Sequence, residues 1–226
     1  MEDWLILAGL GGNLAAYHDL LREAQRRFRI GRIFVLGDVI APGDRASNDA
    51  LWEALTRPQR VLPEICLGWW EYQYLVLRGW TDENEATELL ATCGPGGAKA
   101  LWDAVSPGVA EGLYHLPLAL NPLDALLVHG SPLNVAEALH PEVPPPVLYD
   151  RVRRTGARYL FCARAGIPFR YPIAGGTLHS TCQTLSGEAI ARTYRANPCH
   201  LIGVGRAERG EYAVYNPGSD RLVFVD

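Results

Sequence analysis

Short apolar runs bounded by glycine alternate with amphipathic stretches along much of the chain. Residues 4–8 form one such run, which is too short for a helix and is typical of a buried strand. Residues 14–27 follow it with apolar side chains at helical spacing, and Asn13 is a good N-cap for that helix. The order repeats with a strand at 33–36 and a helix at 48–55. This alternation predicts the α/β class, with a mainly parallel sheet covered by helices.

The rest of the chain continues the pattern and then changes character. We expect further strands at 65–68, 125–128 and 159–162, and helices at 81–93, 98–105 and 147–154. From residue 177 onward strands dominate, and they end in a hairpin of 212–215 and 222–225. A length of 226 residues can bury one full core, so we expect a single domain over residues 1–226.

Composition excludes several classes of partner. The net charge is −4 and the arginines are scattered, so no basic stripe for nucleic acid is present. No apolar stretch approaches the roughly 18 residues needed to cross a bilayer, and no secretion signal is recognisable. The five cysteines are widely spaced and odd in number, which favours reduced thiols. We therefore expect a cytoplasmic protein that binds neither membrane nor nucleic acid.

Glycine-rich or polar segments follow the predicted strands. Ligands of open α/β sheets bind beyond the carboxyl ends of the strands, so these segments are expected to converge on one crevice. They are Gly9-Leu10-Gly11-Gly12-Asn13, Gly37-Asp38, Gly68-Trp69-Trp70-Glu71, His129-Gly130-Ser131-Pro132 and the segment around Arg164.

The order and spacing of these segments resemble those of the calcineurin-like metallophosphoesterases, in particular the small prokaryotic phosphodiesterase-type members. The family pattern runs Asp-x-His-Gly-Asn, Gly-Asp, Gly-Asn-His-Asp/Glu, His-Gly-x-Pro, Gly-His-Thr-His-x-Pro-Phe and Asn-Pro-Gly-Ser. The resemblance covers essentially the whole chain. It implies an αββα sandwich of four layers, in which two central mixed β-sheets are flanked by helices.

The chain keeps only part of that pattern. The retained family positions are Asn13, Asp38, Glu71, His129 and Asn197, the last in Asn197-Pro198-Cys199-His200 where Asn-Pro-Gly-Ser would stand. The substituted positions are Gly9, Gly11, Trp69, Trp70, Arg164 and Gly166. The resemblance implies that Trp70 replaces the general acid and that the other five replace metal ligands.

The substitutions have a consequence for metal binding. By resemblance, one metal would keep only Asp38 as a protein ligand, and the other would keep Asp38 and His129. A catalytic metal normally needs about three protein ligands. We therefore expect no metal cofactor, and hydrolysis that is lost or weak. The fold would then serve a binding or regulatory role with an unidentified partner, and a homodimer is the expected assembly because members of the family commonly form homo-oligomers.

Two alternatives remain open at this point. In one, the protein is an active metal-dependent phosphodiesterase or phosphatase with a Mn or Zn site rebuilt around Asp38, His129 and His200, with His179, Cys182 or Cys199 as further ligands. In the other, it is a metal-free binder of phosphate-bearing small molecules. The backbone donors at the start of the first helix would then hold the anion, with the residues Gly11, Gly12, Asn13 and Arg164 around it.

The conspicuous side chains also have structural interpretations. Asp38 is a common turn residue, His129 can bond to backbone, and Trp69-Trp70 can fill core space left by metals. Arg164 carries a sharper hypothesis: its guanidinium is expected to pair with Asp38 and to supply the charge of the missing metal.

Overall fold

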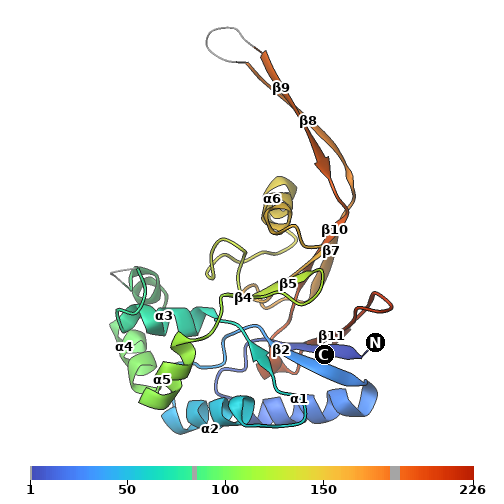
Figure 1. Cartoon of the computed structure of the whole chain (residues 1–226). Helices are drawn as coiled ribbons and strands as arrows, with labels where there is room; N and C mark the ends of the chain where they lie inside the picture. The colour runs from blue at the N-terminus through green and yellow to red at the C-terminus, as the bar shows by residue number, and fades with distance from the viewer. Residues whose placement is uncertain (1, 83–85, 184–188) are drawn as a thin grey trace.

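Two five-stranded β-sheets pack face to face at the centre of the molecule (Figure 1). The computed structural model describes residues 2–82, 86–183 and 189–226, and within residues 177–196 it describes the backbone alone. The strands are β1 (Asp3–Leu7), β2 (Ile30–Val35), β3 (Glu64–Ile65), β4 (Ala119–Leu120), β5 (Ala125–Val128), β6 (Tyr159–Cys162), β7 (Phe169–Ile173), β8 (Gly176–Gln183), β9 (Ala189–Ala196), β10 (Cys199–Gly203), β11 (Tyr212–Asn216) and β12 (Arg221–Val225). The helices are α1 (Leu14–Arg27), α2 (Arg45–Thr56), α3 (Trp69–Leu77), α4 (Thr87–Asp103), α5 (Pro107–Tyr114), α6 (Pro145–Thr155) and the 3₁₀ turn η1 (Ala207–Arg209).

Both sheets are mixed. The first has the order β12-β11-β1-β2-β3. Strands β1, β2 and β3 are parallel, β11 runs antiparallel to β1, and β12 runs antiparallel to β11. The second has the order β4-β5-β6-β10-β7, with β5, β6 and β10 parallel and the outer strands antiparallel. The α/β class and the paired mixed sheets are therefore confirmed.

The layers follow from which side chains each strand buries. Strand residues alternate between the two faces of a sheet, so the first sheet directs Trp4, Ile6 and Phe34 towards the second sheet. Tyr159 and Phe161 of the second sheet pack against them. The opposite face of the first sheet packs on α1 and α2, and the outer face of the second sheet packs on α6. Each large apolar side chain buried in this way contributes about 1.5–3 kcal/mol. The result is the four-layer αββα sandwich that the sequence motifs implied.

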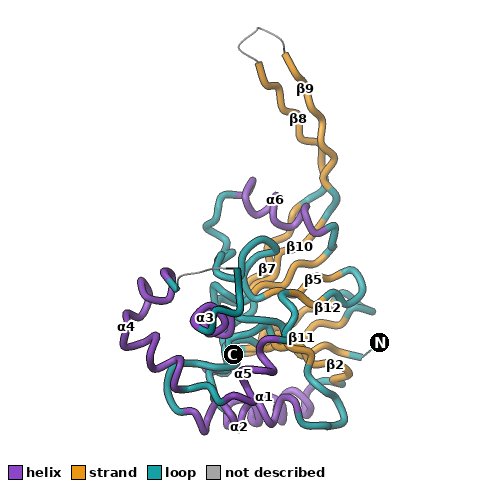
Figure 2. The backbone as a smooth tube through the Cα atoms, turned by 60° about the vertical axis from the view of Figure 1, so that its left-hand side comes forward, coloured by secondary structure: helices purple, strands orange, loops and turns teal. Residues whose placement is uncertain are grey.

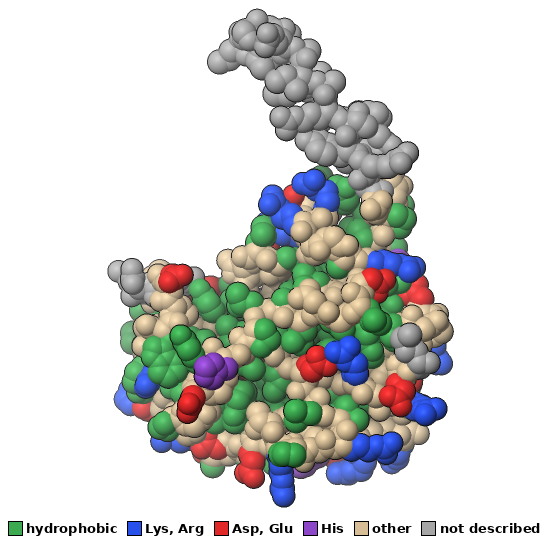
Figure 3. All heavy atoms as spheres, in the orientation of Figure 1, with side chains coloured by type: hydrophobic (Ala, Val, Ile, Leu, Met, Phe, Trp, Pro, Cys, Tyr) green, Lys and Arg blue, Asp and Glu red, His purple; other side chains and the backbone are tan. Residues whose placement is uncertain are grey.

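A third group of helices, α3 to α5, lies beside the sandwich and has its own apolar core (Figure 2). We had predicted no helix at 69–77, because α3 (Trp-Trp-Glu-Tyr-Gln-Tyr-Leu-Val-Leu) is apolar almost all round and lacks a helical period. The predicted helices at 81–93 and 98–105 are parts of α4, which starts at Thr87 and is interrupted at Gly94 with φ of 66°. Hydrophobic side chains are visible on the surface over α4 and α5 (Figure 3).

The hairpin of β8 and β9 extends away from both sheets (Figures 1 and 2). Among the residues that the structure describes, no helix is long and apolar enough to cross a membrane. Four cysteines are free thiols: Cys66, Cys93, Cys162 and Cys199. Burial raises the pKa of Cys162 to about 12, so this thiol stays protonated and unreactive at neutral pH.

Candidate functional site

The loops that follow the parallel strands meet at one edge of the two sheets, as predicted. The backbone N–H of Gly9 donates to the carbonyl of Gly37 at 3.1 Å, which joins the loops after β1 and β2. The N–H groups of Ala163 and Arg164 both donate to the carbonyl of His129 at 2.7 Å, which joins the loops after β5 and β6. These bonds hold the crevice together through the backbone, independently of any ligand.

The carboxylate of Glu71 is the organising group of this crevice. It is fully buried and accepts four backbone N–H groups, from Gly68, Asp38, Val39 and Ile40, at 2.7–2.9 Å. Glu71 lies in the first turn of α3, so one side chain fixes both the start of this helix and the loop after β2. Burial and the neighbouring charge of Asp38 raise the pKa of Glu71 to about 7, although the N–H donors act in the opposite direction.

The loop that Glu71 holds is tightly built. Gly37 has φ of +70° and Asp38 has φ of +52°, a conformation that non-glycine residues rarely adopt. A Cβ at Gly68 would lie 2.7 Å from the carbonyl carbon of Gly37 and would overlap the backbone nitrogen of Asp38. The two backbones are therefore in direct contact. The strained Asp38 is held in place by the bonds to Glu71 and by the N–H of Trp70, which donates to its Oδ1 at 3.1 Å.

Asp38 and His129 form a buried pair. Their side chains are 7% and 2% exposed, and His129 Nε2 lies 3.5 Å from Asp38 Oδ2. His129 Nδ1 lies 2.7 Å from the carbonyl oxygen of Leu36, and because a carbonyl only accepts, Nδ1 carries a proton. Nε2 has no hydrogen-bond partner, so in the neutral ring its lone pair faces the carboxylate. The pair is therefore oriented to share a proton or a cation.

Arg206, which sequence reasoning missed, packs against the loops after β1 and β6. A Cβ at Gly9 would lie 3.5 Å from Arg206 Cγ, and a Cβ at Gly166 would lie 2.5 Å from Arg206 Nε. Both glycines have positive φ, of 65° and 63°. The guanidinium reaches Glu208 through Nη1 at 3.3 Å. Arg206 follows β10 just as the other site residues follow their strands, and this placement was the signal that could have revealed it.

Arg164 does not make the contact that we predicted. It forms no ion pair with Asp38 within the described part of the chain, and its guanidinium lies over the ring of Trp69, 4.5 Å from the ring centroid. Trp69 is 1% exposed, donates from Nε1 to Glu88 at 2.9 Å, and packs its ring edge-on against Trp70. The delocalised charge of arginine is stable over a tryptophan face, and this contact competes with a carboxylate.

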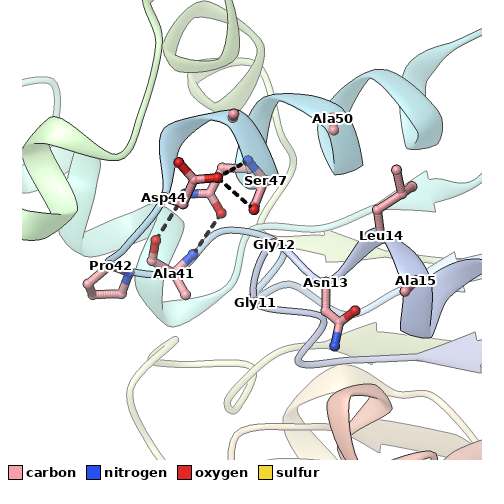
Figure 4. Close-up of a pocket in the computed structure, with 12 residues that line it drawn as sticks. Gly11, Gly12, Asn13, Leu14, Ala15, Ala41, Pro42, Asp44, Ser47 and Ala50 are labelled. Atoms are coloured by element: carbon pink, nitrogen blue, oxygen red, sulfur yellow. Dashed lines mark hydrogen bonds between the residues drawn. The ribbon is translucent and has the colours of Figure 1, made fainter.

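The backbone of the predicted anion-binding loop is already engaged. The N–H groups of Gly11, Gly12 and Asn13 donate to carbonyl groups at 2.7–2.9 Å. The Asn13 side chain accepts from Ala16, which confirms it as the N-cap of α1. A pocket lies between this loop and α2, but Asp44 caps α2 there and accepts from the Ser47 backbone and hydroxyl (Figure 4). The backbone donors that the metal-free alternative would use are therefore occupied by carbonyl groups of the chain itself, and a carboxylate lies on the α2 side of the pocket.

Comparison with known proteins gives matches to solved structures alone. No family model and no curated protein sequence matches the chain. Among solved structures, the chain is similar to a metallophosphoesterase from Sphaerobacter thermophilus, with 18% identity, a TM-score of 0.68, and coverage of 99% of this chain and 88% of the other. A hypothetical protein from Pyrococcus horikoshii OT3 is similar at 16% identity and a TM-score of 0.70, with coverage of 100% and 88%. A putative diadenosine tetraphosphatase is similar at 13% identity and a TM-score of 0.51, with coverage of 99% and 93%.

The chain has the calcineurin-like metallophosphoesterase fold. Sequence identities below 20% show that the architecture is shared, and they do not show a shared function.

The donor set of this crevice does not fit a two-metal centre. His129 and Asp38 are arranged like two ligands of one metal, with an unpartnered Nε2 facing a carboxylate oxygen. Beyond them, Gly9 and Gly166 offer no side-chain donor, and the stem of Arg206 lies against both. No group of three His, Cys, Asp or Glu side chains that could hold a metal is found among the described residues. Two protein donors are fewer than the three or so that normally hold a catalytic metal.

In the alternative with a rebuilt metal site, His200 would join Asp38 and His129, and the structure places it away from both. His200 lies in β10 opposite Tyr159, the first residue of β6, whereas the crevice lies beyond Cys162 at the other end of that strand. A strand rises about 3.3 Å per residue, so His200 is on the order of 10 Å or more from the crevice loops. Its ring stacks on Tyr159, and burial lowers the pKa of His200. Cys199 is buried beside it, and the side chains of His179 and Cys182 lie outside the described residues.

The last retained position has no role in the crevice. Asn197 precedes β10 at the same far end of the sheet as His200. A literal Asn-Pro-Gly-Ser occurs at 216–219 and forms the turn between β11 and β12, where Asn216 Oδ1 accepts from Gly218 and Ser219 at 3.0 Å. This motif therefore serves as a turn in this chain.

Proposed function

We propose that this protein uses the metallophosphoesterase fold for binding or regulation, without two-metal hydrolysis. The observation that carries the proposal is the position of Arg206 against Gly9 and Gly166. At two of the positions where the family would place metal ligands, the chain has glycine and packs an arginine stem against it. With Asp38 and His129 as the remaining donors, there is no clamp for the attacking and leaving oxygens of a phosphoester.

The metal content of the purified protein tests this proposal. The untagged protein is incubated with Mn²⁺ and Zn²⁺, desalted, and analysed by elemental mass spectrometry. We expect metal well below one equivalent, because two protein donors bind divalent ions weakly. The matched sample is the His129→Ala variant. Near-stoichiometric metal in the wild type that disappears in this variant would overturn the proposal and would identify Asp38 and His129 as ligands.

A second candidate function has its own supporting observation. Arg206 and Arg164 bring two guanidinium groups to the loops after β10 and β6, and Arg164 has no carboxylate partner among the described residues. Guanidinium groups bind phosphate oxygens in a bidentate manner and need no metal. We propose that the ligand of the crevice carries a phosphate group, bound by side chains rather than by the glycine-rich loop.

Thermal unfolding with pyrophosphate as the probe tests the second candidate. We expect millimolar pyrophosphate to raise Tm by about 2–4 °C, equivalent to about 1 kcal/mol for a chain of this size. The Arg206→Met and Arg164→Met variants should each lose most of that shift. The Arg153→Met variant, which removes an arginine of α6, should show the same rise in Tm as the wild type. A shift that survives both crevice substitutions would place the anion elsewhere and would refute this candidate, while leaving the metal result unaffected.

A further inference from the structure

An open pocket lies outside the crevice, where the segment after α3 faces α5. Its volume is about 550 Å³. It is lined by Gly79, Trp80, Thr81, Asp82, Glu111 and Tyr114. None of these residues belongs to the family motifs, and the sequence analysis singled out none of them.

Two aromatic rings form the wall of this pocket. Trp80 is 38% exposed and Tyr114 is 55% exposed, which is unusual for large aromatic side chains that pack against each other. Their ring centroids are 5.4 Å apart and their planes meet at 75°. Two rings at this angle make a corner that exposes aromatic surface to solvent.

The rim of the pocket is negatively charged. Asp82 and Glu111 are both exposed, and neither has an ion pair or a side-chain hydrogen bond within the part of the chain that the structure describes. No lysine or arginine is among the described residues that line the pocket. Two carboxylates without an ion pair, beside an aromatic corner, attract a cation that can also contact the rings.

The same aromatic surface already holds one cation of the chain. The guanidinium carbon of Arg78 lies 4.8 Å from the centroid of Trp80 and 4.9 Å from that of Trp102. Arg78 is not among the lining residues, so it does not fill the pocket. The contact shows that the Trp80 ring accepts a guanidinium on its surface.

We propose that the pocket binds an organic cation, a guanidinium or alkylammonium group, between Trp80, Tyr114 and the carboxylates of Asp82 and Glu111. The cation is carried by a small molecule or by an arginine or lysine side chain of a protein segment. This site is separate from the crevice, and its existence does not depend on the proposed function of the crevice.

The proposal is tested by nuclear magnetic resonance of the full chain, with the tryptophan indole N–H signals as the readout. The signal of Trp80 is assigned by its absence in Trp80→Phe. N-acetyl-arginine amide is the probe, and N-acetyl-citrulline amide, which has the same shape without charge, is the matched control. We expect a saturable shift of the Trp80 signal with the arginine probe at millimolar concentration, and no comparable shift with the citrulline control at equal ionic strength.

Variants locate the site and distinguish its elements. Glu111→Gln and Asp82→Asn should each weaken binding of the arginine probe by about threefold to fivefold, since each removes one charge from an exposed rim. Trp102→Phe, which lies on the far side of Arg78, should bind as the wild type does. Equal shifts with arginine and citrulline, or unchanged binding in both carboxylate variants, would overturn the proposal.

Two further probes separate the sources of the cation. A glycine-flanked arginine peptide that binds at least tenfold more tightly than the amide would identify a protein segment as the carrier. Equal affinity, together with binding of tetramethylammonium, would identify a free organic cation. Either result supports the site itself, because both require the charge and the rings.

Discussion

Replacing Glu71 with alanine is expected to lower the free energy of unfolding by at least about 4 kcal/mol. The substitution leaves four buried N–H groups without an acceptor, those of Gly68, Asp38, Val39 and Ile40. Each orphaned buried donor costs about 1–3 kcal/mol, and partial relaxation prevents the four costs from adding fully. Chemical denaturation followed by circular dichroism measures the loss.

A graded variant and a control separate this explanation from a general intolerance of substitution. Glu71→Gln keeps one acceptor oxygen, so its loss should be about half that of the alanine variant. Glu53→Ala, at an exposed position on α2, should change stability by no more than about 0.5 kcal/mol. If the glutamine and alanine variants were equally unstable, the count of accepted bonds would not be the cause.

The effect of Glu71 should also depend on pH. Its pKa is raised from the usual 4.5 to about 7, so between these values the native protein binds more protons than the unfolded chain. The stability that this group contributes is therefore fully present below pH 4.5 and is lost as pH rises through about 7. The difference in unfolding free energy between the wild type and Glu71→Gln should narrow from pH 5 to pH 8, and a widening difference would contradict the direction of the pKa shift.

Replacing Gly68 with alanine is the second substitution with a large expected effect, a loss of at least about 3 kcal/mol. The added Cβ would overlap the backbone nitrogen of Asp38 and approach the carbonyl carbon of Gly37. Neither neighbour is a flexible side chain, so the two loops must separate, and the bonds from Glu71 to both would be broken. The loss is measured by thermal and denaturant unfolding.

Gly96 supplies the matched control for this substitution. It lies within α4, and a Cβ there would meet no atom within 4 Å. Alanine has the higher helix propensity, so Gly96→Ala should be neutral or stabilising by about 0.5–1 kcal/mol. A Gly68→Ala protein as stable as the wild type would show that the close approach of the two loops is not required by the fold.

The backbone contacts that build the crevice do not depend on the side chains that would bind a metal or a ligand there. Glu71, Gly37 and Gly68 act on the backbone, and their contacts are complete without a ligand. In the proposed function, the positions that would act on a metal or a substrate are those at which glycine, tryptophan and arginine stand. The proposal is therefore compatible with an intact fold, because the backbone contacts of the crevice need none of those side chains.

Much of the architecture follows from local pattern. Short apolar runs ending in glycine predicted the buried strands at residues 4–8 and 125–128, and the cap at Asn13 predicted the start of α1. The pattern failed at α3, because a helix that is buried on nearly all sides has no polar face to mark its period. Hydrophobic periodicity reports exposure on one side, and an element enclosed by neighbours loses that signal.

The sequence by itself determined the α/β class, the strand-end placement of Asp38 and His129, and the absence of a side-chain donor at Gly9 and Gly166. These properties depend on residue type and on neighbours along the chain. Only the tertiary structure decided which side chain packs against Gly9 and Gly166 and where the guanidinium of Arg164 lies. Arginine side chains reach far and have several stable partners, so their contacts depend on which surfaces the fold brings near them. The packing placed Arg206 against Gly9 and Gly166, and it placed Arg164 over Trp69.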